Sequence, residues 1–207
     1  MIPPAMRTET IKHVGRQEVA DSILRASAPV WVRAAGVVGF AAATAVGAWI
    51  TIPLPGTPVP LTLQTLFVLL AGATLGSRLG TLSMVFYLLL GTTGYHVFAA
   101  GNWGLSTVFG ATGGYLIGFV LAQPVLGTLT RPRDGLWPRL LLAVLAGNAI
   151  IFGCGLTWLA MWSGGGLEQA LRWGLWPFVP GLIVKTAVAI GVGGLAVTKL
   201  RRLFDGR

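Results

Sequence analysis

Long stretches without any charged side chain dominate this sequence, and they limit the environments in which the chain can fold. Residues 34–77 and 79–130 contain no Asp, Glu, Lys or Arg. Of the 207 residues, 54% are apolar and only 10% are charged, and the mean hydropathy is +0.76. A soluble domain carries about 25% charged residues, so this chain has too few polar groups to coat a water-soluble globule. We expect an all-α, polytopic integral membrane protein.

Six apolar segments are candidates for membrane-spanning helices. A span at modest tilt needs about 20 largely apolar residues. The expected spans are residues 31–50, 61–75, 79–90, 112–129, 138–162 and 176–200. The second and third are short and are separated only by Gly76, Ser77 and Arg78, so we expect them to form a single hairpin region. Pro124 is expected to break the fourth span, because proline removes a helical hydrogen bond.

The basic residues predict how these spans are oriented. Thirteen of the 15 Lys and Arg residues lie in the terminal segments and in alternate loops. They are Arg7, Lys12, Arg16, Arg25, Arg33, Arg78, Arg131, Arg133, Arg139, Lys199, Arg201, Arg202 and Arg207. Because cytoplasmic loops are enriched in Lys and Arg, both termini should face the cytoplasm. Residues 1–30 and 201–207 would then be cytoplasmic tails that flank a transmembrane domain of residues 31–200.

Two uncharged loops are expected on the opposite side of the membrane. Residues 51–60 are rich in proline, and residues 91–111 are rich in glycine, aromatic side chains and amide or hydroxyl groups. Non-helical backbone at membrane depth has to be buried in protein or line a cavity. These loops therefore either fold back as a lid over a cavity or form plain surface loops.

Lys185 lies several residues inside the last expected span. An ionisable group at that depth has a large free-energy cost unless it is paired or hydrated, so we interpret it first as a functional residue. The alternative is that its side chain snorkels to the membrane surface. No acid lies within any expected span, and the nearest, Glu168, is in an outer loop. An anionic ligand would supply the missing negative charge.

Other residues in the spans allow two interpretations each. Gln64, with Thr62 and Thr65, opens the second span, where it could bind a polar ligand or cap and bridge helices. Asn148 in the fifth span is open in the same way. Small residues on the first span could pack inside the subunit or dock a partner protein; they are Ala35, Gly39, Ala43 and Gly47, with Ala41 and Ala45 beside them.

Signatures of catalysis are missing from the sequence. Val184-Lys185-Thr186 lacks the glycine that precedes the lysine of a phosphate-binding loop. His13 and His96 are far apart and have no cluster of Cys or acidic neighbours, so no metal site is predicted. Cys154 is the single cysteine and lies in an apolar run. We therefore expect no enzymatic activity, and the charge of +9 at the ends of apolar segments does not indicate a nucleic-acid partner.

Three sequence runs carry a resemblance to a known family. The first is IPLPGTPVPLTLQTL at residues 52–66, followed by LLAGATLG at residues 69–76. The second combines VFAAG at 97–101 with GATGGYLIGF at 110–119, and the third is PGLIVK at 180–185. Together they resemble the BioY family over residues 31–200.

The resemblance implies a six-helix substrate-binding (S) component of an energy-coupling factor (ECF) transporter. Such components hold a vitamin near the outer face, under the loops that join helices 1 and 2 and helices 3 and 4. They work with a transmembrane coupling protein and two ATPase subunits, although some BioY proteins are reported to act alone. Ala41 and Ala45 resemble the docking surface for the coupling protein. BioY proteins often carry an Asp three residues before the lysine, where this chain has Leu182.

Under this resemblance the leading hypothesis is a subunit that binds biotin for uptake across the bacterial cytoplasmic membrane, without a cofactor. Lys185 would bind the carboxylate or a polar ring group. The candidate hydrogen-bonding residues are Thr62, Gln64, Asn102, Tyr115 and Asn148, while Trp103 and Trp158 could pack on the bicyclic ring. Another vitamin as ligand, or a purely structural membrane subunit, are the alternatives. A homo-oligomer is left open.

Overall fold

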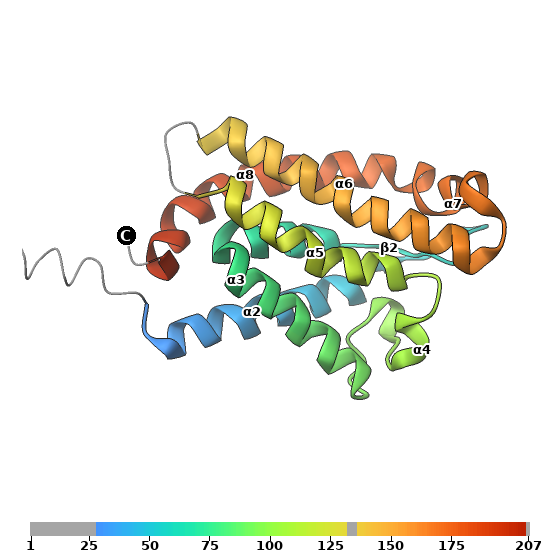
Figure 1. The fold of residues 1–207 in the computed structure, drawn as a ribbon, viewed down its shortest axis with the longest axis horizontal. Coiled ribbons are helices and arrows are strands. Elements are labelled where there is room, and N and C mark those ends of the chain that lie inside the picture. The colour runs from blue at the N-terminus through green and yellow to red at the C-terminus, as the bar shows by residue number, and fades with distance from the viewer. Residues whose placement is uncertain (1–27, 132–135, 206–207) are drawn as a thin grey trace, which may run out of the picture.

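The computed structural model describes residues 28–131 and 136–205, which form the helical bundle of Figure 1. Its long helices are α2 (Val30–Trp49), α3 (Gln64–Thr92), α5 (Gly113–Leu129), α6 (Leu136–Ser163) and α8 (Val179–Asp205). Its short elements are β1 (Thr51–Ile52), β2 (Leu61–Thr62), η1 (Ala99–Gly101), α4 (Leu105–Val108), α7 (Gly166–Gly174) and η2 (Trp176–Phe178). Within the described ranges, 4 helical stretches are long and apolar enough to cross a membrane, and α5 is a shorter apolar helix. Most of residues 1–30 and residues 206–207 lie outside the described ranges, so the predicted tails stay predictions.

Helix α3 is folded back on itself at Gly76. Gly76 has φ 81° and ψ 178°, a conformation that glycine adopts most readily. The Gln64 side chain donates to the Tyr87 hydroxyl at 2.6 Å, although 23 residues of straight helix would separate them by about 34 Å. The two arms, residues 64–75 and 77–92, are therefore antiparallel, as the hairpin prediction requires. With α2, α5, α6 and α8 they account for the six expected spans.

The expected break at Pro124 does not occur. Helix α5 runs without interruption from Gly113 to Leu129, with Pro124 inside it. Its neighbours hold this part of α5 in place: a Cβ on Gly127 would meet the backbone of Ser77, and the Ser77 hydroxyl donates to the Pro124 carbonyl at 3.1 Å. The carbonyl that proline deprives of its helical donor is that of Val120, and a transmembrane helix tolerates this loss where packed neighbours keep it in place.

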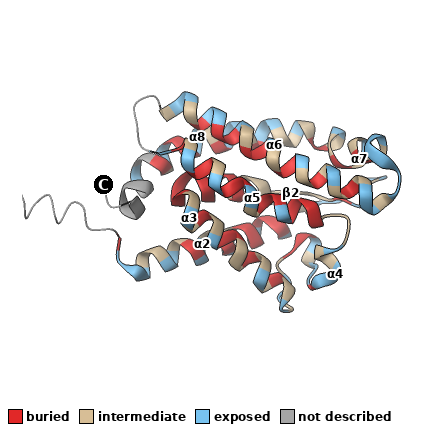
Figure 2. Ribbon diagram, in the orientation of Figure 1, coloured by how far each residue is buried: buried red, intermediate tan, exposed pale blue. Residues whose placement is uncertain are grey.

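Close glycine contacts pack α5 against α6. A Cβ on Gly114 would lie 2.3 Å from the Cβ of Trp158, and one on Gly118 would lie 2.8 Å from the Cα of Ile151. Small residues of this kind let membrane helices approach closely enough for dispersion contacts to hold them together. Figure 2 shows the result, with buried residues gathered on the inward faces of α3, α5 and α6 and exposed residues along their outer edges.

The two ends of the bundle differ in structure (Figure 1). The first turn of α2, the fold of α3 at Gly76 and the last turns of α8 lie at one end, which we call the basic end because Arg33, Arg78 and Lys199 lie there. The other end, the loop end, carries the β1–β2 pair, α4 and α7. The sequence had suggested only loops for residues 51–60 and 91–111, and the structure adds these short strands and turns.

The loops at the loop end are held to the rest of the bundle by side-chain hydrogen bonds. β1 and β2 pair antiparallel, with Thr51 opposite Thr62. The Thr57 hydroxyl donates to the Trp173 carbonyl at 2.7 Å, and Trp49 Nε1 donates to the His96 carbonyl at 2.8 Å. Both loops therefore fold over the bundle, as the lid interpretation requires, rather than extending from it.

Candidate ligand-binding cavity

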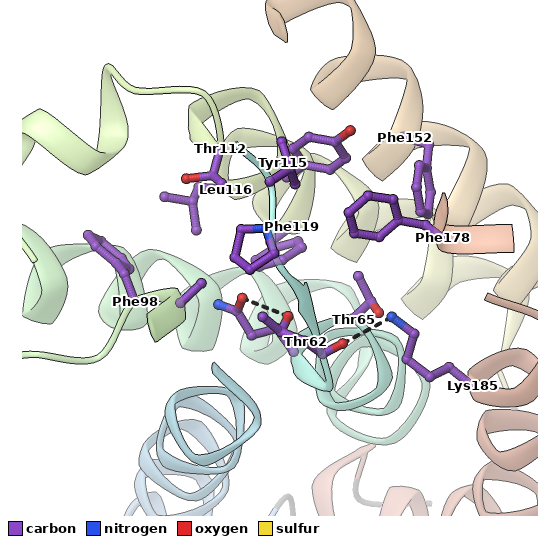
Figure 3. A pocket seen from close by; sticks show the side chains of 14 residues that line it. Thr62, Thr65, Phe98, Thr112, Tyr115, Leu116, Phe119, Phe152, Phe178 and Lys185 are labelled. Carbon is purple, nitrogen blue, oxygen red and sulfur yellow. Dashed lines mark hydrogen bonds between the residues drawn. The ribbon is translucent and has the colours of Figure 1, made fainter. Parts of the chain in front are cut away.

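A cavity lies beneath these two loops, and both loops and the long helices α3, α5, α6 and α8 contribute to its lining (Figure 3). The lining residues come from the β1–β2 loop, from β2, from the start of the first α3 arm and from η1, α5, α6, η2 and α8. They are Val59, Pro60, Thr62, Gln64, Thr65, Phe98, Ala99, Thr112, Tyr115, Leu116, Phe119, Phe152, Phe178 and Lys185. Most of this surface is apolar, and its polar groups converge on β2, the start of α3 and Lys185. A cavity of this type suits an organic ligand with a few polar groups.

Aromatic rings form most of the apolar lining. Tyr115 and Phe152 meet edge to face with their centroids 5.8 Å apart, and Phe152 meets Phe178 in the same manner at 6.3 Å. Phe98 lies on the opposite side of the cavity in Figure 3. Its ring meets that of Tyr87 edge to face, with the ring centroids 5.6 Å apart. Rings packed in this way are held rigidly by their neighbours, so they present a largely preformed surface to a ligand.

Lys185 is the cavity's cationic group. Its residue is only 6% exposed, and its Nζ donates to the Thr62 carbonyl at 3.1 Å. No carboxylate pairs with Lys185 among the residues that the structure describes. The ion pair in this part of the chain joins the exposed Arg172 and Glu168 on α7, at 2.7 Å. A buried ammonium with one carbonyl partner retains donors for a second acceptor. The site can therefore receive an anionic or strongly polar ligand group.

A chain of hydrogen bonds leads from Lys185 to the second loop. Thr62 accepts from Lys185 through its carbonyl, and its hydroxyl donates to Gln64 Oε1 at 3.0 Å. Gln64 Nε2 donates to the Tyr87 hydroxyl, which in turn donates to the Val97 carbonyl at 2.8 Å. The chain fixes the positions of β2, both arms of α3 and residue 97 of the lid relative to the lysine.

Thr65 has a different status in the cavity. Its Oγ1 is buried, and it has no hydrogen-bond partner among the described residues. An unsatisfied buried hydroxyl destabilises a protein by about 1–3 kcal/mol, so its presence in the lining suggests that a ligand completes its bonding. Figure 3 places Thr65 beside the ammonium end of Lys185.

Comparison with known proteins identifies the family. The family model described as the BioY family matches residues 21–202 of the chain. The chain belongs to the BioY family. The resemblance carried by the three sequence runs is confirmed.

Named relatives and a solved structure support the same assignment. The chain is 39% identical over 164 residues to the biotin transporter BioY of Thermotoga maritima, a match that covers 79% of this chain and 92% of that protein. It is 40% identical over 151 residues to the probable biotin transporter BioY of Pyrococcus horikoshii, covering 73% of this chain and 87% of that protein. A crystal structure of the S-component for biotin from an ECF-type ABC transporter matches with a TM-score of 0.72 and 21% identity, covering 99% of this chain and 100% of that one. At that identity the match shows the fold, and the expected S-component architecture is confirmed.

Within this BioY chain, the structure brings only some of the predicted ligand residues together. Lys185, Gln64, Thr62 and Tyr115 line the cavity, and the Tyr115 hydroxyl also donates to the Gly174 carbonyl at 2.9 Å. Phe98 and Thr65 also line the cavity, and Tyr87 supports it from behind through Gln64 and Phe98; none of the three is among the predicted ligand residues.

The other predicted ligand residues lie outside the lining. Asn102 donates back to the Ala99 carbonyl at 2.9 Å, and Trp103 is 51% exposed on the lid. Trp158 Nε1 donates to the Gly110 carbonyl at 2.9 Å, so it braces the segment before α5. Asn148 lies one turn from Phe152 on α6 and donates to the Thr186 hydroxyl at 3.1 Å. Their roles as ligand contacts stay predictions.

The structure also shows the surroundings of the predicted docking residues, Ala41 and Ala45, and of Leu182, which stands where BioY proteins often have an Asp. Ala41 and Ala45 are 1% and 7% exposed, so the small-residue face that they form packs inside the subunit. Ala35 and Gly39, on the same predicted small-residue face, are exposed, so docking of a partner subunit on this helix stays a prediction. Leu182 lies one turn before Lys185 on α8 and packs against the hydrophobic core. It gives the lysine no carboxylate.

Proposed function

We propose that this BioY protein binds biotin in the cavity beneath the two loops and delivers it across the bacterial cytoplasmic membrane without altering it chemically. The observation that carries the proposal is the buried Lys185, which has no carboxylate partner in the described part of the chain and lies in an aromatic cavity of a BioY-family protein. Biotin has one carboxylate on an apolar tail and a compact bicyclic ring with polar edges. Such a molecule matches a cavity with one cation, several aromatic rings and a few hydroxyl and amide groups.

The carboxylate of the ligand is assigned to Lys185. A charge-assisted hydrogen bond is stronger than a neutral one, and it is strengthened further where water is excluded. With Leu182 in the position of the acid, no carboxylate of the described residues competes for the ammonium. The bicyclic ring then packs among Phe98, Phe119 and Phe178, with Thr65 as a hydrogen-bonding partner.

Membrane orientation and partners complete the proposal. Both termini face the cytoplasm, and the loop end, with its lid, faces outward where biotin arrives. A transmembrane coupling protein and two ATPase subunits energise the transport, since within the described residues the chain has no phosphate-binding loop of its own.

The decisive experiment is a binding titration of the purified protein with biotin and with biotinamide, which lacks the negative charge. We expect biotin to bind more tightly than biotinamide to the natural chain, and Lys185→Gln to lower biotin affinity roughly 10- to 100-fold, as expected for loss of a charge-assisted bond. The same substitution should remove the preference for biotin over biotinamide. The matched control is Lys199→Gln, at an exposed lysine of α8.

Two outcomes would contradict different parts of the proposal. Unchanged biotin affinity in Lys185→Gln would remove the lysine from the site while leaving biotin as the ligand. A thermal-shift series in which thiamine or riboflavin stabilises the protein and biotin does not would remove biotin itself, because a ligand stabilises the state that it binds.

A further inference from the structure

A groove runs along the outer surface of the bundle between α2 and the second arm of α3, away from the cavity. It is lined by Val30, Arg33, Ala34, Val37, Val38, Leu79, Leu82, Val85, Phe86 and Leu89. Every lining side chain except Arg33 is apolar. Leu82 and Leu89 remain 55% and 57% exposed, so the groove is open along its length. It faces the surroundings of the bundle rather than its interior.

Arg33 lies at the end of the groove nearest the basic end. The Ser83 hydroxyl donates to the Val37 carbonyl at 2.8 Å, which fixes the register of the two helices. One turn earlier on each helix, Arg33 is level with Leu79, and the exposed Arg78 precedes Leu79. Two guanidinium groups therefore belong to the same end of an otherwise apolar groove.

The Arg33 side chain lacks a partner for a buried donor. Its Nε is buried and forms no hydrogen bond among the described residues. A guanidinium presents its donors in a planar fork that matches two oxygens of a phosphate or carboxylate. The groove thus combines an apolar channel with an unsatisfied anion-binding group at one end.

We propose that this groove binds an anionic phospholipid, with one acyl chain along the α2–α3 channel and the phosphate on Arg33. The first turn of a membrane helix lies at the depth of the lipid headgroups, so a phosphate reaches Arg33 there without leaving the interface. An apolar helix from a second protein would fill the same channel but would supply no acceptor for Arg33. The charge at the end of the groove therefore favours a lipid over a protein as its occupant.

The test measures retained lipids by native mass spectrometry of the full chain, purified in detergent with equal amounts of phosphatidylglycerol and phosphatidylcholine. We expect phosphatidylglycerol to be retained with a preference of about fivefold, which corresponds to about 1 kcal/mol. Arg33→Gln should reduce the preference to parity. Arg139→Gln, which removes a basic-end arginine outside the groove, should preserve it. The proposal would be overturned if the natural chain retained phosphatidylglycerol and phosphatidylcholine equally, or if Arg33→Gln left the preference for phosphatidylglycerol unchanged.

A second pair of variants tests the acyl-chain channel without changing charge. Leu82→Trp fills the groove, and Leu142→Trp is its control because both leucines are 55% exposed. We expect only Leu82→Trp to lose bound phosphatidylglycerol. Displacement of the lipid by inorganic phosphate at matched concentration would show that the headgroup alone is bound and would overturn the role of the groove. A dimer that dissociates in Leu82→Trp, with no lipid preference in the natural chain, would assign the groove to a second copy instead.

Discussion

At the scale of single residues, the unpaired hydroxyl of Thr65 gives the sharpest test of the cavity. Thr65→Val keeps the shape of the side chain and removes a buried Oγ1 for which the described residues provide no hydrogen-bond partner. We expect biotin affinity to fall about 5- to 10-fold, in keeping with the loss of one neutral hydrogen bond. The stability of the ligand-free protein should stay the same or rise, because an unsatisfied buried group is removed. Calorimetric titration and thermal unfolding measure the two effects.

A matched substitution separates these effects from the loss of any buried hydroxyl. Thr44→Val removes a fully buried hydroxyl on α2 that donates to the Phe40 carbonyl at 2.8 Å, away from the cavity. It should leave biotin affinity unchanged. If Thr65→Val bound biotin as tightly as the natural chain, the hydroxyl would not contact the ligand.

The sequence predicts those cavity residues whose polar or charged side chains are costly to place inside an apolar membrane span. Lys185 stands out because a charge inside an apolar span requires an explanation, and Gln64 stands out as a buried amide at a span's start. Thr65 and Tyr87 are ordinary residues of apolar helices, and only the fold at Gly76 gives them their places. Asn102, Trp103 and Trp158 were proposed for their side-chain chemistry, but their observed hydrogen bonds and exposure depend on tertiary contacts that sequence spacing does not encode.

At the scale of elements, the contact between α3 and the lid depends on one glycine. A Cβ at Gly91 would lie 2.1 Å from the Phe98 ring, which is fully buried against the end of the second α3 arm. We expect Gly91→Ala to displace Phe98 from the cavity lining, to lower stability by about 1–3 kcal/mol and to weaken biotin binding. Thermal unfolding and a binding titration give the two quantities.

The control and the rescue for this change are both available in the chain. A Cβ at Gly153, on α6, would meet no atom of the described residues within 4 Å, so Gly153→Ala should be tolerated. Adding Phe98→Leu to Gly91→Ala should recover part of the lost stability, because the smaller side chain makes room for the new methyl group. Equal effects of Gly91→Ala and Gly153→Ala would contradict the proposed contact.

Element boundaries were predictable where the membrane itself sets the pattern. The expected span 31–50 is one residue from α2 at each end, and the expected span 112–129 is one residue from α5 at its start. Uncharged apolar runs with flanking prolines or glycines mark the ends of both spans. The predicted break at Pro124 was wrong because neighbouring helices decide the effect of a proline. Helix α5 stays helical where it packs against the backbone of Ser77. The strands β1 and β2 and the helix α7 are stabilised by contacts across the loop end, which a local pattern does not reveal.

At the scale of the whole molecule, polar functions are divided between the two ends. The ligand cavity and its lid occupy the loop end, whereas Arg33, Arg78 and Lys199 lie at the basic end (Figure 1). Because the α3 hairpin adds two antiparallel arms, the first turn of α2 and the last turns of α8 lie on the same side. In the proposed orientation, with these positively charged segments in the cytoplasm, the cavity opens outward and the proposed ATPase subunits act from the opposite face.

This orientation predicts which positions an impermeant maleimide can reach. In a Cys154→Ala background, Tyr95→Cys places a thiol at a 62% exposed position of the loop end, and Arg78→Cys places one at an exposed position of the basic end. In intact cells we expect labelling of Tyr95→Cys and not of Arg78→Cys, because the reagent does not cross the membrane. Inside-out vesicles should give the reverse pattern. Labelling of Arg78→Cys in intact cells would place the basic end outside, and the charge distribution would then have misidentified the side from which biotin enters.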